Sequence, residues 1–467
     1  MRRTIILLIA LCAVPAIAAE ISPTRLTFDA ALQRAVQVNN QVEQSRQEIL
    51  AADANRSFLL SAVMPRINLN GNLQRNSIER SFGSGKDAVT ILPRNNWNYQ
   101  ITMQQPLFAG RRELRAYSQA KLGVQNAREN TRGTEDDTIL RVASSFLALI
   151  NADARIDVEK KNIELAENRR KQSQAFYQAG EVTRVDVLRA ETAVKAAQRQ
   201  LAAAQQARQN AESDLRAALD LTGPIDAVPP EQKLPPVPDE ETLVRRAEET
   251  RPDVSVAGNN LQIARLEVSK QRGFWLPTVF FNGGLINQKS SFPANNYVFG
   301  ALQFSVPIFQ SGEVIARVAG AKAREEEAKI GLQNMKIIAR EDVHKALVAL
   351  ESANTSLGLA KEQLAAAEAE YAQSFELYRA QEATSLDVAT SEASLADARR
   401  AVAEETLNRD LAELRVWYAA GEIKDAVGVP AETGTLRSGA RKGLADEKPQ
   451  SEILRSAQDD VKGVSNQ

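Results

Sequence analysis

The feature that most constrains this fold is an internal repeat with a constant spacing of 201 residues. Residues 177–191 read YQAGEVTRVDVLRAE, and residues 378–392 read YRAQEATSLDVATSE. The identical pairs include Tyr177/Tyr378, Glu181/Glu382, Thr183/Thr384, Asp186/Asp387, Val187/Val388 and Glu191/Glu392. Repetition on this scale indicates that one supersecondary unit occurs twice, so the two halves of the chain should share one architecture.

The N-terminus has the pattern of an export signal. Arg2 and Arg3 precede an apolar run at 5–14, and Ala-Ile-Ala at 16–18 is a small-x-small cleavage motif, so residues 1–18 are predicted to be a signal peptide. The only cysteine, Cys12, lies inside this segment. Leu11 before it is not the small residue that a lipidation signal requires, so lipid attachment to Cys12 is not expected.

The rest of the chain limits how it could enter a membrane. No later run of 18 apolar residues occurs, so no transmembrane helix is predicted beyond the signal. Only helices and closed barrels satisfy their backbone in lipid, so a membrane-embedded form of this chain must use a closed β-barrel. The net charge of -1, without a sustained basic run, argues against nucleic acid as a partner.

The first repeat is predicted to span residues 19–223. It begins with a helix over 26–62, and a β-hairpin follows at about 66–108, where apolar residues alternate with asparagine and glutamine. A soluble sheet covering a core would show the same alternation. The uncharged polar face and the aromatic residues Trp97 and Tyr99 near a strand end favour a sheet in contact with lipid instead.

A long αα-hairpin is predicted over residues 110–221. Residues 110–179 contain no proline and would extend about 100 Å as one helix. The return helix from Asp186 carries apolar residues at alternating spacings of three and four, interrupted only at Arg208, which is typical of a coiled-coil seam. We therefore expect two antiparallel helices that pack along their whole length.

The second repeat is predicted to span residues 241–420, after a proline-rich linker at 224–240. It contains a helix, a β-hairpin at about 278–309 and an αα-hairpin at 311–420. Even the interrupting Arg208 has a counterpart in Arg409. Residues 421–467 lack aromatic residues and are rich in glycine, serine and charged residues, so we expect a disordered tail.

The strand count requires an assembly. Each repeat supplies one β-hairpin, and about four strands cannot close a barrel, for which about eight are the practical minimum. If these strands lie in a membrane, several chains must therefore combine. Three copies would supply about 12 strands, and their helices would form a second, helical barrel.

The duplicated motifs resemble those of the TolC-like outer-membrane efflux protein family. The resemblance covers about residues 26–421 and rests on the two tips, on Met64-Pro65 and its copy Leu276-Pro277, and on Gln105-Pro106-Leu107-Phe108 and its copy Val306-Pro307-Ile308-Phe309. It implies a mainly α protein with a membrane β-barrel. A homotrimer would form a 12-stranded outer-membrane β-barrel, continued by a periplasmic α-helical barrel.

The resemblance also implies a function. Such a protein is the exit duct of a tripartite efflux or type I secretion system, and its partners are a periplasmic adaptor, an inner-membrane RND or ABC pump and outer-membrane lipid. It is not an enzyme and needs no cofactor. The alternative is a periplasmic coiled-coil adaptor or scaffold, but adaptors generally carry one long hairpin per chain rather than two.

Four residues are candidates for a periplasmic gate. In the resemblance, Asp387 matches the first carboxylate of the family's pore rings, and the second falls at Thr390, which is not acidic. Tyr378 matches a tyrosine that bonds to an aspartate at Asp186, whereas the family's locking arginine falls at Ala383. A plainer interpretation is that Asp186 and Asp387 cap the N-termini of the return helices, and both roles can hold at once.

The tips themselves are candidate adaptor contacts. The residues concerned are Gly180 and Thr183 in the first tip and Gln381 and Thr384 in the second, although glycine and threonine are also ordinary turn and cap residues. Because Gln381 replaces a glycine, the backbone of the second tip is expected to differ from that of the first. No metal site is predicted, because His344 is the only histidine and no cysteine lies near it.

Overall fold

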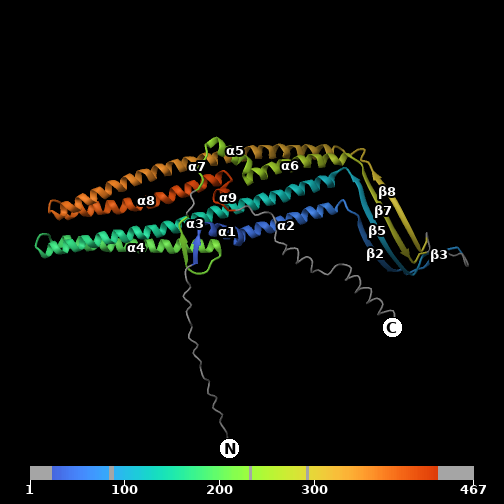
Figure 1. The fold of residues 1–467 in the computed structure, drawn as a ribbon. Coiled ribbons are helices and arrows are strands. Elements are labelled where there is room, and N and C mark those ends of the chain that lie inside the picture. The colour runs from blue at the N-terminus through green and yellow to red at the C-terminus, as the bar shows by residue number, and fades with distance from the viewer. Residues whose placement is uncertain (1–23, 84–88, 231–233, 291–293, 430–467) are drawn as a thin grey trace, which may run out of the picture.

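The computed structural model describes residues 24–83, 89–230, 234–290 and 294–429. The predicted signal peptide and residues 430–467 lie outside this range. The molecule is elongated, with a four-stranded sheet at one end and the tips of two helical hairpins at the other (Figure 1). Within the described ranges, every helix is too short or too polar to cross a membrane.

The two long hairpins confirm the repeat. The first consists of α3 (Arg112–Gln178) and α4 (Arg184–Leu219), and the second of α7 (Glu313–Arg379) and α8 (Ser385–Ala419). α3 and α7 each contain 67 residues, and α4 and α8 pack back along them. Five buried apolar residues of α4 lie on the predicted seam, namely Val187, Ala190, Val194, Ala204 and Leu215, and Leu219 is buried one turn further along.

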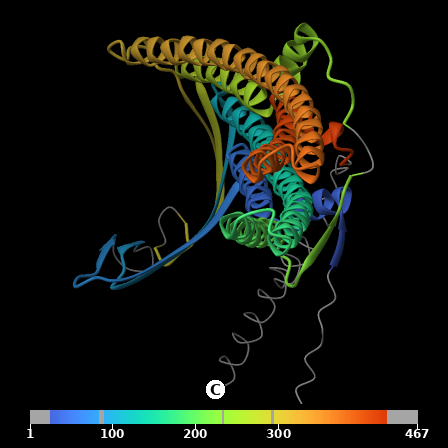
Figure 2. The same ribbon diagram turned by 90° about the vertical axis from the view of Figure 1, so that its left-hand side faces the viewer.

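The strands form one antiparallel sheet in the order β2-β5-β7-β8. These strands are β2 (Arg66–Arg75), β5 (Asn95–Ala109), β7 (Thr278–Gln288) and β8 (Asn296–Ser305). Between β2 and β5, the short strands β3 (Arg80–Phe82) and β4 (Val89–Leu92) pair with each other. Viewed from the tips, the sheet sweeps away from the helices as a curved ribbon (Figure 2).

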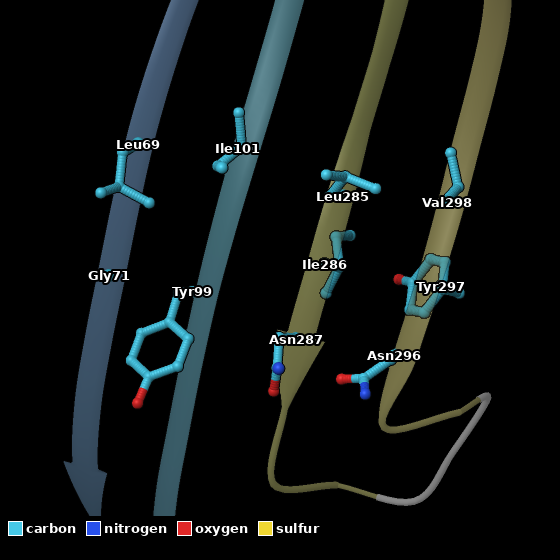
Figure 3. A pocket seen from close by; sticks show the side chains of 10 residues that line it. All are labelled: Leu69, Gly71, Tyr99, Ile101, Leu285, Ile286, Asn287, Asn296, Tyr297 and Val298. Carbon is cyan, nitrogen blue, oxygen red and sulfur yellow. The ribbon is translucent and has the colours of Figure 1, made fainter.

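One face of the sheet carries uncovered apolar side chains. The register aligns one apolar residue from each strand in a single row, consisting of Leu69, Ile101, Leu285 and Val298. Figure 3 shows this row beside Tyr99, where the side chains line a shallow pocket of about 740 Å³. Leu69 and Val298 each remain 74% exposed. An apolar surface of this kind requires lipid or protein to cover it.

The main hydrophobic core lies midway along the molecule, where shorter elements pack against α3. These are β1 (Thr24–Thr27), α1 (Phe28–Val38) and β6 (Ile225–Val228), whereas α2 (Asn40–Ser61) packs along α3 outside this core. Leu32 and Phe146 are fully buried in this core, and the ring of Phe28 meets that of Phe146 edge-on at 5.4 Å. On the other side, α5 (Glu240–Thr250) and α6 (Pro252–Arg272) pack against α7, and the 3-10 turn η2 (Gly273–Trp275) leads into β7.

The predicted short helices are each broken in two. The helix expected over 26–62 is interrupted after Val38. Asn39 caps the start of α2, because its side chain accepts a hydrogen bond from the N–H of Gln41. In the second repeat, Pro252 is the first residue of α6. Proline is tolerated there because the first N–H groups of a helix have no partner within the helix. The predicted linker at 224–240 is also partly regular, because β6 within it pairs in parallel with β1.

The expected start of the disordered tail at 421 is wrong. After α8, the short helix α9 (Ile423–Ala426) packs against α3, and Ile423, Val427 and Val429 are buried in the main core. Lys424 Nζ lies 2.6 Å from a carboxylate oxygen of Glu135 on α3. These apolar residues are spaced among small and charged ones, so composition alone did not reveal that they belong to the core.

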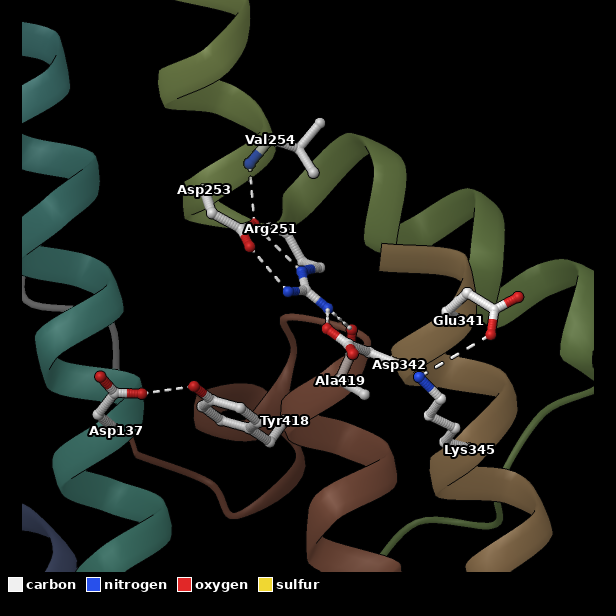
Figure 4. A network of polar contacts seen from close by, with 9 residues as sticks. All are labelled: Asp137, Arg251, Asp253, Val254, Glu341, Asp342, Lys345, Tyr418 and Ala419. Carbon is white, nitrogen blue, oxygen red and sulfur yellow. Dashed lines mark hydrogen bonds and ion pairs between the residues drawn. The ribbon is translucent and has the colours of Figure 1, made fainter. Parts of the chain in front are cut away.

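Polar contacts from residues of both repeats hold the end of α8 in place (Figure 4). Arg251 Nη1 lies 2.9 Å from Asp342 Oδ2 and donates to the carbonyl of Ala419. From α3, Asp137 accepts a 2.5 Å hydrogen bond from the hydroxyl of Tyr418. Burial raises the pKa of Tyr418 well above its ordinary value, and the bond to Asp137 adds to this shift. These contacts therefore fix the base of the second hairpin, which is the end opposite its tip.

Candidate functional site at the helical tips

The first tip is a short turn with a capping box. Gly180 has a φ of 81°, and the N–H of Glu181 donates to the carbonyl of Phe176 at 2.9 Å, which closes the end of α3. Asp186 Oδ2 then accepts from the N–H of Thr183 at 3.1 Å and from its hydroxyl at 2.8 Å. The first of these bonds satisfies the backbone N–H of Thr183, the residue that caps the start of α4.

The second tip has the same backbone, so the expected difference at Gln381 is wrong. Gln381 adopts a φ of 64°, in the left-handed region that Gly180 occupies in the first tip. The reason is the same helix-ending bond, from the N–H of Glu382 to the carbonyl of Leu377 at 2.8 Å. Asp387 caps α8 as Asp186 caps α4, and it accepts from the N–H of Thr384 at 2.8 Å.

Both tip aspartates therefore have the capping role, and both carboxyls have lowered pKa values. The hydroxyl of Ser385 donates to Asp186 and is the main cause of the lowered pKa of that carboxyl. For Asp387, the hydrogen bonds from Thr384 lower the pKa. Both groups are therefore ionised at neutral pH. The Ser385–Asp186 bond also joins the two tips within one chain.

The predicted bond between Tyr378 and Asp186 is replaced by other partners. Tyr378 is only 3% exposed, and its hydroxyl lies 3.3 Å from that of Ser173 on α3. Its ring meets the ring of Phe176 edge-on at 5.5 Å. Tyr378 lies in the last turn of α7 and faces α3. Asp186 instead accepts hydrogen bonds from Thr183 and from Ser385.

The two tips enclose a polar groove of about 470 Å³. Gly180 is not among the residues that line it, and a methyl group at that position would meet no atom within 4 Å. Thr390 is exposed one turn into α8, where its hydroxyl donates to the carbonyl of Leu386 at 3.0 Å. The groove is lined by Phe176, Glu181, Val182, Thr183, Asp186, Arg189, Tyr378, Gln381, Ala383, Thr384, Ser385 and Leu386.

Above the tips, α3 and α8 meet along a contact with buried charges, here called the inner seam. Glu159 is 1% exposed, and Arg400 Nε donates to it at 2.7 Å. Nearer the tip, Arg169 Nη1 lies 2.8 Å from Glu392 Oε2, although that oxygen accepts no hydrogen bond. Burial raises the pKa of Glu392, and Arg169 opposes the shift.

No local sequence pattern predicts the inner seam. Its partners come from different repeats and are more than 200 residues apart, and each one resembles an ordinary charged residue on a helix surface. The signal available in the sequence was that residues at these positions differ between the two repeats. At a spacing of 201, Arg169 corresponds to Glu370 and Glu159 to Ala360.

The comparisons with known proteins identify the family. The sequence pattern of the outer membrane efflux protein family matches residues 31–220 and 243–422, which correspond to the two repeats. The chain belongs to the outer membrane efflux protein family. It is therefore a protein of the outer membrane that serves as an exit duct in efflux, as the motifs indicated.

Individual members of the efflux protein family are similar to the chain over most of its length. The outer membrane efflux protein BepC of Brucella suis biovar 1 (strain 1330) is 23% identical over 381 residues, or 79% of each chain. The pyoverdine export outer membrane protein OpmQ of Pseudomonas aeruginosa (strain PAO1) is 23% identical over 84% of this chain and 85% of its own.

The fold is also shared with a solved channel. The open state of the Neisseria gonorrhoeae MtrE outer membrane channel aligns with a TM-score of 0.72 and 18% identity. The alignment covers 86% of this chain and 90% of that one. These comparisons confirm the predicted mainly helical fold, the family and the outer-membrane location, and they disfavour the adaptor alternative.

Proposed function

We propose that three copies of this efflux protein form one continuous duct. The observation that carries the proposal is the four-stranded sheet, which has two unpaired edges, β2 and β8, and an uncovered apolar face. Three such sheets, joined edge to edge, give a closed barrel of about 12 strands that places the apolar face against lipid. The long hairpins then continue the barrel as a helical tube into the periplasm.

The duct serves a tripartite system. A periplasmic adaptor joins the tips to an inner-membrane pump of the RND or ABC class, and the pump supplies the energy. The names of BepC and OpmQ, an efflux protein and a pyoverdine export protein, support a role in export. Pyoverdine is the substrate of OpmQ, and the tip geometry described above does not select among substrates.

The periplasmic opening is the gate in this proposal, and Asp387 and Thr390 on α8, with Tyr378 and Asp186, surround it. Three copies place three Asp387 carboxylates around one axis, where their charges repel and attract cations. Asp387→Ala is expected to raise the single-channel conductance in planar bilayers and to weaken block by divalent cations. Glu404→Gln is the control, because it removes an exposed carboxylate 17 residues, or roughly 25 Å, further along α8. Equal conductance in the two variants would reject the gate.

The adaptor contact is proposed at the turn residues Gly180, Thr183, Gln381 and Thr384. Glu181 and Glu382 occupy matching exposed positions between them, so cysteines there leave the caps intact. We expect both Glu181→Cys and Glu382→Cys to cross-link to the adaptor in intact cells, whereas Glu404→Cys should not. Cross-linking at Glu404 alone would place the adaptor along the helices instead of at the tips.

A further inference from the structure

The end of the sheet farthest from the helices carries a group of exposed cations, here called the rim cluster. The short strand β3 lies at this end of the molecule (Figure 1). The cluster consists of Arg75 at the end of β2, Arg80 in β3, Arg94 just before β5 and Lys289 just after β7. All four side chains are exposed, and none forms an ion pair within the part of the chain that the structure describes.

The rim cluster has little acidic charge to oppose it. Among the described residues of the two β-hairpins, 66–83, 89–109, 278–290 and 294–309, Glu79 is the only acidic one. The rim of each chain is therefore positively charged. Arg80 also lies between Ile78 and Phe82, which are 50% and 76% exposed. A positive surface that includes exposed apolar side chains suits an anionic amphiphile better than a small anion.

The strand register places two of these cations on the face that carries the apolar row. Side chains alternate along a strand, so Arg75 shares the face of Leu69 in β2. The N–H of Lys289 donates to the carbonyl of Trp97 at 2.9 Å, so the pairing of β7 with β5 continues to Lys289, which shares the face of Leu285. At about 3.4 Å per residue, Lys289 lies about 14 Å and Arg75 about 20 Å beyond the apolar row.

Two aromatic residues lie between the apolar row and the cations. Tyr99 follows Ile101 toward the rim, as Figure 3 shows, and Trp97 comes next. Their rings stack with centroids 5.0 Å apart and an interplanar angle of 25°. Tryptophan and tyrosine are enriched where the hydrocarbon of a membrane gives way to the headgroups. The cations beside and beyond Trp97 are therefore at the level of the lipid headgroups.

We propose that the rim cluster binds the phosphate groups of lipids in the outer leaflet of the outer membrane. The inference rests on the proposed trimeric duct, because the closed barrel turns the apolar row toward lipid and the rim toward the cell exterior. Each arginine can donate two parallel N–H bonds to one phosphate, and Lys289 adds a compact positive charge beside Trp97. The acyl chains of the same lipid cover the apolar row, so each copy holds phosphorylated lipid at the barrel surface.

Lipid binding to the purified trimer tests the proposal. The probe is diphosphorylated lipid A, added to the full chain in detergent and counted on the intact trimer by native mass spectrometry. The rim variant combines four substitutions: Arg75→Gln, Arg80→Gln, Arg94→Gln and Lys289→Gln. A lysine or arginine near an anionic lipid surface contributes about fivefold in affinity, so the rim variant should bind lipid A at least about tenfold more weakly.

The matched control removes the same charge from the first helical hairpin. Its four cations are also exposed and without an ion pair among the described residues, and the substitutions are Lys161→Gln, Arg170→Gln, Lys171→Gln and Arg199→Gln. The control variant should bind lipid A as tightly as the unaltered protein. Equal losses in the two variants would overturn the proposal, because the effect would then be one of net charge.

Two further ligands show which part of the lipid is recognised. Lipid A stripped of its phosphate groups should bind weakly, and equally so to the unaltered protein and the rim variant. Inorganic phosphate in large excess should not displace lipid A, because it has no acyl chains to cover the apolar row. Displacement by inorganic phosphate would reject a lipid as the occupant. Tight binding of the stripped lipid would show that the phosphate groups are not recognised.

Salt and a charge-preserving variant provide an independent readout. Salt screens exposed charges, so lipid A binding by the unaltered protein should weaken as salt is raised, whereas that of the rim variant should hardly change. Arg75→Lys combined with Arg80→Lys and Arg94→Lys keeps the charge and should retain most of the affinity. If this variant bound as weakly as the rim variant, charge would not hold the lipid and the proposal would fail. Failure of the proposed duct would appear differently, as a single-chain mass for the unaltered protein before lipid is added.

Discussion

Replacing Gly110 with alanine is expected to prevent most of the protein from reaching its folded form in the outer membrane. Gly110 connects β5 to α3 and has a φ of 65°. An added Cβ would lie 2.2 Å from the carbonyl oxygen of Gly273, which connects α6 to β7. Backbone strain and overpacking each cost roughly 1–3 kcal/mol, so the expected loss is about 2–6 kcal/mol.

Gly123→Ala is the matched control for this prediction. Gly123 lies inside α3, where an added Cβ meets no atom within 4 Å. Alanine is the better helix former, so this variant should gain roughly 0.5–1 kcal/mol. The measurement is the amount of folded protein in the outer-membrane fraction, together with its thermal midpoint by circular dichroism. Equal behaviour of the two variants would show that the sheet and the helical tube do not depend on this close approach.

Phe146→Ala is expected to destabilise the main core by roughly 3–5 kcal/mol, the usual range when a buried phenylalanine is replaced and a cavity remains. Phe146 is fully buried, and the ring of Phe28 packs edge-on against it. The effect should appear as a lower midpoint of thermal or denaturant unfolding. Phe82→Ala changes the same residue type in β3, where the side chain is 76% exposed, and should leave the midpoint nearly unchanged. A small effect at Phe146 would show that the core can collapse around the missing ring.

The sequence predicted the parts of this fold that depend on local periodicity. The period of two at 67–74 and 97–104 identified β2 and β5, and the register places Leu69 opposite Ile101 as the alternation requires. The repeat itself identified the two hairpins and their tips. Capping by Asp186 and Asp387 was also predictable, because the motif that produces it spans only four residues.

The remaining features depend on contacts between distant segments. The carboxyl of Glu159 meets Arg400 across 241 positions, and no local pattern marks either residue as buried. Ile423 belongs to the core only because α9 turns back onto α3. The backbone at Gln381 was mispredicted because the residue type was weighed above the helix-ending hydrogen bonds, which require a left-handed residue at that position.

Single-particle electron microscopy of the full chain, extracted from the outer membrane in detergent, tests the central claim most directly. The account predicts particles with threefold symmetry, one closed barrel of about 12 strands and a ring of six hairpin tips around a single pore. The order of the helices around that ring should be α7, α8, α3, α4, with α4 beside α7 of the next copy. Single chains, or a ring of another symmetry, would contradict it.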